Sequence, residues 1–202
     1  MKQILKKIIG IVTLLVIILI VLLAYFGLFT TIKVAEKDVG PYHLVYYFHE
    51  GNYRKSGEIM DRIYHKLIGE DSIKTELGFG IYYDNPKNVP VEKCRSLVGC
   101  ILKKDDAYKM KLLARKYCVA EIPASRSYIV EFPFRGFPSI ILGIIKAYPV
   151  LDESLKQAKK ECPARMEIYD SNAGKIFYLA PTGPGKKFFE DLLSNSKIKW
   201  EG

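Results

Sequence analysis

The sequence predicts an α+β fold in which two successive β-α-β-β segments follow an N-terminal transmembrane helix. Three observations predict it: an uncharged apolar run over residues 8–29, several short segments rich in β-branched and aromatic residues, and a near-constant spacing between matching landmarks. A length of 202 residues allows one domain of ordinary size besides the helix. The 26% of charged residues excludes a polytopic membrane protein.

Residues 8–29 contain neither charge nor proline. A helix of this length spans about 33 Å and matches a hydrocarbon core of about 30 Å. The alternative is a cleaved signal sequence with residues 1–7 as its basic flank, but cleaved apolar regions run about 7–15 residues and end at a small-x-small site. An uncleaved, single-pass anchor is therefore favoured.

The orientation of this anchor is predicted by the lysines that precede it. Lys2, Lys6 and Lys7 lie before the span with no acidic residue among them. The positive-inside rule places such a flank in the cytoplasm, so residues 31–202 are expected outside the cell or in a lumen. This topology corresponds to the ER membrane in a eukaryote, or to the inner membrane with a periplasmic domain in a bacterium.

The first half of the domain follows a linker at residues 30–41. Its helix is expected from Ser56 to about Ile68, where apolar residues recur at helical spacing before Gly69. The strands are expected at residues 43–49, 78–83 and 94–102.

The second half repeats this order of elements. A helix is expected from about Ser139, with Pro149 interrupting it and a second helical piece at residues 150–160. The strands are expected at residues 127–132, 165–169 and 175–179. Residues 103–116 are expected as a surface helix or connection between the halves.

Two pairs of landmarks support a duplication. Gly51 and Gly136, which close the first strand of each half, lie 85 residues apart, and Tyr83 and Tyr169 lie 86 residues apart, each before an aspartate. Such agreement predicts related halves, because unrelated segments seldom keep one offset at two places. The domain is therefore expected over residues 42–183, with halves of about 42–102 and 127–183 and a tail at 184–202.

Two such units can join their sheets edge to edge, with helices on one face and a concave second face. Alternation along the strand would turn Met166 and Ile168 toward the helix and Glu167 toward the open face. With the 86-residue offset, the predicted ligand-binding residues are Phe79, Ile81, Tyr83, Glu167 and Tyr169.

An apolar cleft that holds one carboxylate suits a flat, apolar cation. The alternative is that Glu167 pairs with a neighbouring Arg or Lys while the tyrosine hydroxyls point to solvent.

The remaining composition argues against other partners. The net charge is +9, and the anchor flank accounts for three of these charges. No helix-turn-helix, zinc-finger or aromatic RNA-binding pattern appears, so no nucleic acid is expected as a partner. A lipid bilayer is expected as a partner because of the apolar span. Metal and cofactors are also not expected, because the histidines lack metal-ligand spacing and the cysteines form no CxxC pair. Buried free thiols are the favoured interpretation of the four cysteines, with disulfide pairing outside the cytosol as the alternative. The four cysteines are Cys94, Cys100, Cys118 and Cys162.

Three motifs carry a family resemblance. They are Gly51-Asn52-Tyr53 after the first strand, Tyr82-Tyr83-Asp84-Asn85-Pro86 at the second, and Glu167-Ile168-Tyr169-Asp170 in the second half. Residues 42–183 thereby resemble the GyrI-like small-molecule-binding domain. The longer run from Tyr82 to Leu102 resembles more specifically the head of a single-pass ER-phagy receptor.

The resemblance implies a membrane-anchored module that binds a small apolar or cationic ligand or docks a protein partner. Glu167 is the best match for the glutamate that often serves ligand binding in GyrI-like clefts. Because some GyrI-like proteins are hydrolases, a hydrolase that uses Glu167 is the first alternative. A non-catalytic role is favoured, since no second carboxylate or nucleophile is evident beside it.

The second alternative is a reticulophagy receptor with a short motif for ubiquitin-like autophagy modifiers. Phe189 and Leu192 fit an aromatic-x-x-aliphatic pattern with two acidic residues between them. The competing interpretation is that residues 187–193 form an ordinary helix, because a four-residue pattern this loose often arises by chance.

Overall fold

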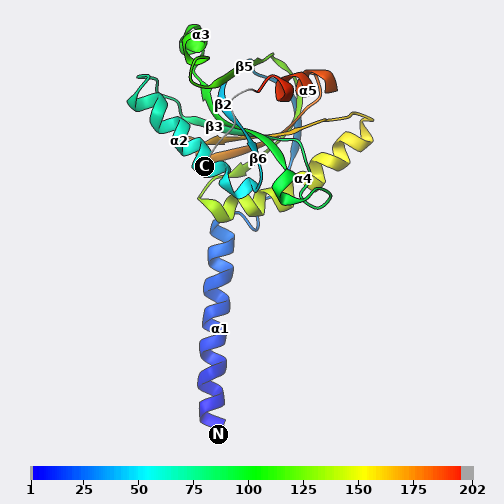
Figure 1. The fold of residues 1–202 in the computed structure, drawn as a ribbon. Coiled ribbons are helices and arrows are strands. Elements are labelled where there is room, and N and C mark those ends of the chain that lie inside the picture. Colours follow the sequence, from blue (N-terminus) through cyan, green and yellow to red (C-terminus); the bar gives the residue numbers. More distant parts are fainter. Residues whose placement is uncertain (1, 197–202) are drawn as a thin grey trace.

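The computed structural model describes residues 2–196 and shows a long helix projecting from a mixed α+β body (Figure 1). The described residues include one eight-stranded sheet in the order β1-β6-β8-β7-β3-β4-β2-β5, with every neighbouring pair antiparallel. The strands are β1 (Val34–Val39), β2 (Tyr42–Glu50), β3 (Leu77–Tyr82), β4 (Arg95–Leu102), β5 (Cys118–Ile122), β6 (Ser125–Pro133), β7 (Arg165–Asp170) and β8 (Lys175–Pro181). The α-helices are α1 (Lys2–Tyr25), α2 (Ser56–Gly69), α3 (Met110–Leu113), α4 (Phe137–Gln157) and α5 (Lys186–Ser194).

Helix α1 stands apart from the body, and none of its residues is buried. By length and composition it is apolar enough to cross a membrane. It ends at Tyr25, earlier than expected, because the chain turns at Gly27, whose φ of +107° favours glycine. Gly27 also lies against the ring of Phe132, where a Cβ would approach to 2.7 Å. The end of the helix is thus packed onto the body.

The two predicted segments have the same internal strand order. In the first, β4 lies between β2 and β3, and in the second, β8 lies between β6 and β7. The segments meet where β3 pairs with β7. The predicted α+β fold and its order of elements are therefore confirmed.

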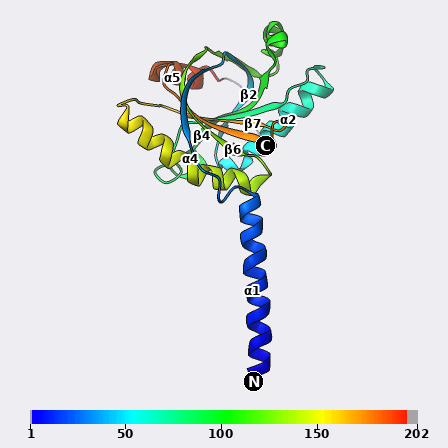
Figure 2. The same ribbon diagram turned by 180° about the vertical axis from the view of Figure 1, so that it is seen from behind.

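Helices cover both faces of the curled sheet (Figure 2). Ile59 and Ile63 of α2 pack on β2 and β4, while Ala147 and Leu151 of α4 pack on β6 and β8. On the other face, Phe189 and other residues of α5 complete an inner core with β3 and β7. The expected arrangement, with one face left open, is wrong.

Three segments differ from the sequence expectation. Residues 30–41 contain β1, which pairs with β6, and residues 184–202 contain α5. Between the halves, the chain adds the short α3 and then β5, which pairs with β2. Strands β1 and β5 form the two edges of the sheet, and α5 packs over its inner face. Contacts with strands distant in the sequence therefore determine these elements.

Helix α4 is continuous through Pro149, where an interruption was expected. Pro149 is exposed, whereas Ala147, Leu151 and Leu155 form a buried stripe that continues across it. Packing of this stripe against the sheet stabilises the helix enough to offset the backbone hydrogen bond that proline removes.

Candidate ligand pocket

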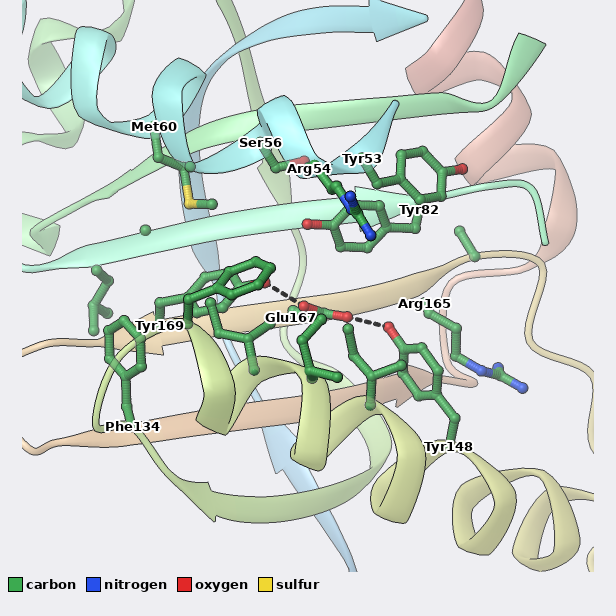
Figure 3. A pocket seen from close by; sticks show the side chains of 18 of the residues that line it. Tyr53, Arg54, Ser56, Met60, Tyr82, Phe134, Tyr148, Arg165, Glu167 and Tyr169 are labelled. Atoms are coloured by element: carbon green, nitrogen blue, oxygen red, sulfur yellow. Dashed lines mark hydrogen bonds between the residues drawn. The ribbon is translucent and has the colours of Figure 1, made fainter. Parts of the chain in front are cut away.

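A large pocket lies between α2 and α4, over the line where β3 meets β7 (Figure 3). Its volume is about 1220 Å³. That is somewhat above the range of about 300–1,000 Å³ that ligand sites usually occupy. The two β-α-β-β segments therefore enclose the site jointly, each contributing one helix and one strand.

Two glycines on β3 leave room beside the sheet for the side chains of Met60 and Tyr82. Gly78 and Gly80 lie on the pocket face, opposite Tyr169 and Glu167 of β7 respectively. Neither glycine has a side chain, so Met60 of α2 packs over Gly78. Tyr82, two residues further along the same face, folds its ring back over Gly80, where a Cβ would lie 2.6 Å from Tyr82 Cζ.

Glu167 is the central polar group of the pocket floor and is only 2% exposed. Its carboxyl oxygens accept hydrogen bonds from the hydroxyls of Tyr148 on α4 and Tyr169 on β7. Figure 3 shows the three groups in a line across the floor. The carboxyl is thus held by two neutral donors that come from different elements.

Burial raises the pKa of the Glu167 carboxyl above its ordinary value, and the hydrogen bonds from Tyr148 and Tyr169 partly oppose this effect. Burial also raises the pKa of both tyrosines well above the ordinary value, and the negative charge of Glu167 adds to it. Both hydroxyls therefore keep their protons at neutral pH and remain donors to Glu167.

No cationic side chain pairs with Glu167 among residues 2–196, although Arg165 lies on the same strand. Arg165 instead forms an ion pair with Asp152 of α4. Asp84, at the edge of the pocket, is held by Arg95 at 2.8 Å. The alternative in which Glu167 pairs with a neighbouring Arg or Lys is therefore wrong.

The walls of the pocket are largely aromatic. The ring of Tyr53 lies edge-on to Tyr82 at 4.8 Å between centroids, and Phe134 lies 5.8 Å from Tyr169. Met60 of α2 adds an adaptable apolar side chain over Gly78. Such walls suit flat apolar groups and, through their ring faces, cations.

Phe79 and Ile81 do not line this pocket, which corrects the sequence prediction. In the observed register Phe79 lies opposite Ile168 and Ile81 opposite Met166, and all four are buried in the inner core beneath α5. Directly opposed residues of antiparallel strands share a face, and a shift by one residue exchanges the faces. The sequence prediction applied an offset of 86 residues, which placed Phe79, Ile81 and Tyr83 on the face of Glu167. The observed register places Gly78, Gly80 and Tyr82 on that face instead.

Of the other predicted residues, Glu167 and Tyr169 lie together on the pocket floor, as described above. Tyr83 lies at the edge of the pocket just after β3. Its hydroxyl donates a hydrogen bond to the carbonyl oxygen of Phe189 at 3.0 Å, so it ties the strand to α5. Tyr83 is thus partly a core residue.

The predicted autophagy-modifier motif is also corrected. Phe189 is fully buried and Leu192 is 8% exposed, and both belong to helix α5 and the inner core. An aromatic and an aliphatic side chain must be free to enter a partner's pockets, so these two cannot serve as a docking motif in this fold. The competing interpretation as a helix is confirmed.

Sequence reasoning missed two site residues, Tyr82 and Tyr148. The alternation of Gly78, Gly80 and Tyr82 marks one face of β3, and it would have placed Tyr82 in the pocket. Tyr148 follows Ala147, the last of the small residues that recur every four positions from Ser139 and allow α4 to lie close to the sheet. That pattern would have predicted that Tyr148 lies at the edge of the interface between α4 and the sheet.

Residues 2–196 contain no group of three or more His, Cys, Asp or Glu side chains placed to hold a metal ion. The four cysteines are free, and Cys94, Cys100 and Cys118 are buried. The prediction of buried free thiols is therefore confirmed for these three.

No protein-family model matches the chain. It is 29% identical over 203 residues to human testis-expressed protein 264, covering 96% of this chain and 62% of the human protein. It is 31% identical over 184 residues to the mouse homolog, covering 87% of this chain and 57% of the mouse protein. The chain thus spans about three fifths of the length of these relatives.

The solved structure of the EcmrR C-terminal domain is similar in fold. It matches with a TM-score of 0.53 at 9% identity and covers 75% of this chain and 98% of that domain. At this identity the similarity concerns the fold alone, and it is consistent with a GyrI-like architecture. The chain therefore combines a sequence similar to testis-expressed protein 264 with the fold of the EcmrR C-terminal domain.

Proposed function

We propose that this protein is a membrane-anchored, non-catalytic module that binds a small apolar cation in the pocket between α2 and α4. The observation that carries this proposal is Glu167, a buried carboxyl with tyrosine donors in a largely aromatic pocket. A cation that enters the pocket would supply the charge that the protein does not.

The energetic reason is desolvation. A buried carboxylate without a cationic partner is costly, and its raised pKa is the expression of that cost. A ligand cation beside Glu167 would stabilise the ionised form, while the rings of Tyr82, Tyr148 and Tyr169 contact the apolar part of the ligand. A neutral ligand of the same shape gains only the second contribution.

The test uses tetraphenylphosphonium as probe and triphenylphosphine oxide as an uncharged aromatic comparator. Titrated against the full chain in detergent, the cation is expected to bind more tightly than the neutral compound, and Glu167→Gln is expected to remove that preference. Glu190→Gln, a matched change on the exposed side of α5, should leave it intact. Equal binding of the cation by wild type and Glu167→Gln would overturn the proposal.

The anchor is part of the same proposal. Helix α1 meets the length and composition of a membrane span, and Lys2, Lys6 and Lys7 favour a cytoplasmic N-terminus. The domain would then face the ER lumen or the periplasm. Protease added to sealed vesicles should leave an intact fragment that includes residues 31–202, and complete digestion would show the opposite orientation.

Hydrolysis is a second candidate, favoured by one observation. A carboxyl whose pKa is raised by burial, as that of Glu167 is, suits a general acid or base. This candidate predicts turnover of reactive electrophiles that Glu167→Gln abolishes. Absence of turnover across a broad panel, with cation binding retained, supports the non-catalytic module.

A reticulophagy function is supported only by the resemblance to ER-phagy receptor heads and by the similarity to testis-expressed protein 264 over most of this chain. Because Phe189 and Leu192 are buried, this function would require a docking segment elsewhere. Precipitation of the full chain with ubiquitin-like autophagy modifiers tests it, and no binding would reject it for these 202 residues.

A further inference from the structure

Helix α4 carries an exposed apolar stripe on the side away from the sheet. Phe137, Ile141 and Ile145 recur every four residues and are 58%, 41% and 63% exposed. The same three residues form part of the rim of the ligand pocket. Since α4 already buries its opposite side, this stripe is a second apolar surface on one helix.

The stripe lies next to the place where α1 joins the body. Arg135, just before α4, donates a hydrogen bond to the carbonyl oxygen of Tyr25 and lies 4.8 Å over its ring. Lys146, within α4, donates to the carbonyl oxygen of Thr30 at 2.7 Å. Figures 1 and 2 both show the first turns of α4 at the top of α1.

These contacts fix the height of α4 relative to the anchor. The chain between the end of α1 at Tyr25 and the start of β1 at Val34 is short, and Gly27 is buried against Phe132. The body therefore cannot move far along the axis of α1. If α1 crosses a bilayer, the first turns of α4 lie at its interface.

The residues around the stripe match an interface in composition. Tyr25 and Phe29, at the end of α1, are 56% and 69% exposed and supply aromatic side chains at that level. Arg135 and Lys146 bring positive charge beside the apolar stripe, the combination found in amphipathic helices that lie in the headgroup region of a membrane.

We propose that Phe137, Ile141 and Ile145 are immersed in the interface of the same bilayer that α1 crosses, so that the rim of the pocket meets the membrane. This inference rests on the proposed anchor. An amphiphilic cation that partitions into the bilayer then reaches the pocket along α4 without first entering bulk water. The bilayer also covers apolar side chains that the protein leaves exposed.

The experiment places single tryptophans in the full chain in nanodiscs that contain phosphatidylcholine and phosphatidylglycerol. The only native tryptophan, Trp200, is replaced in a Trp200→Phe background. Ile145→Trp reports on the stripe, Leu15→Trp on the anchor, and Leu112→Trp on a matched exposed residue of α3, which is 62% exposed. Quenching by lipids brominated at defined acyl positions is measured for each.

Emission from Leu15→Trp and Ile145→Trp is expected to be lost to brominated lipid, with Ile145 quenched most by the bromines nearest the headgroup, while Leu112→Trp stays unquenched. Quenching at Leu15 but not at Ile145 overturns this inference and leaves the anchor intact. Absence of quenching at Leu15 overturns the anchor itself. Blue-shifted but unquenched emission from Ile145→Trp would show that another protein surface covers the stripe, and also overturns the inference.

Discussion

The hydroxyl of Tyr148 on α4 donates a hydrogen bond to the carboxyl of Glu167 on β7. This contact joins the helix to the sheet at the bottom of the pocket and also influences the protonation of Glu167. Because α4 carries the pocket rim as well, the ligand site, the charge on Glu167 and the position of α4 are linked through one side chain.

Tyr148→Phe is expected to weaken tetraphenylphosphonium binding and to lower the free energy of unfolding by about 1–3 kcal/mol, because Glu167 loses a hydrogen bond in a buried site. The pKa of Glu167 should also rise further, since the hydroxyl opposes the effect of burial. Calorimetric titration measures the change in binding, and chemical denaturation measures the change in the free energy of unfolding, each with the full chain in detergent.

The control is Tyr108→Phe, which removes a hydroxyl from a side chain that is 77% exposed, far from Glu167 in sequence. It should change neither property. If Tyr148→Phe behaves as this control does, the hydrogen bond contributes nothing to the site.

The pH dependence of binding and stability should carry the sign that Glu167 predicts. The folded protein retains this proton above the ordinary pKa of 4.5, at which the unfolded chain releases it. The contribution of Glu167 to stability therefore falls as pH rises from about 4.5 through the raised pKa, and binding of a permanent cation tightens over the same range.

Wild type and Glu167→Gln should be compared by denaturation and by titration at several pH values, since all other groups cancel in the difference. The free energy of unfolding of wild type is expected to decline relative to the variant as pH rises. A constant difference would show that Glu167 titrates with its ordinary pKa.

Gly80→Ala is expected to reduce ligand affinity more than stability. The added methyl group would lie 2.6 Å from Tyr82 Cζ, so the ring must move, and the free space beside it is the pocket. Gly69→Ala, at the end of α2 with open space around it, is the matched control. Equal affinities for the two variants would contradict the role assigned to Gly80.

Phe189→Ala should destabilise the domain by about 3–5 kcal/mol, because it removes a fully buried aromatic ring from the inner core. Lys187→Ala, an exposed change in the same helix, should have little effect. Chemical denaturation of wild type and of the two variants measures this difference in stability. An unfolding curve unchanged by Phe189→Ala would show that α5 is not part of the folded core.

The sequence alone was sufficient for the local features. The uncharged apolar run predicted α1, the helical spacing of apolar residues predicted α2, and segments rich in β-branched and aromatic residues predicted six of the strands. Alternation along its strand, together with the family resemblance, singled out Glu167. These features depend on near neighbours in the chain, where side-chain spacing directly reflects helical or extended geometry.

Only the tertiary structure decided which side chains meet. Whether Phe79 or Gly80 faces Glu167 depends on the register between β3 and β7, which lie far apart in the sequence, and an error of one residue exchanges the two faces. Tyr148 joined the site because α4 remains helical past Pro149, and Phe189 became a core residue because α5 folds back beneath the sheet. Long-range packing determined these placements, and no local pattern along the chain encodes a contact with a distant strand.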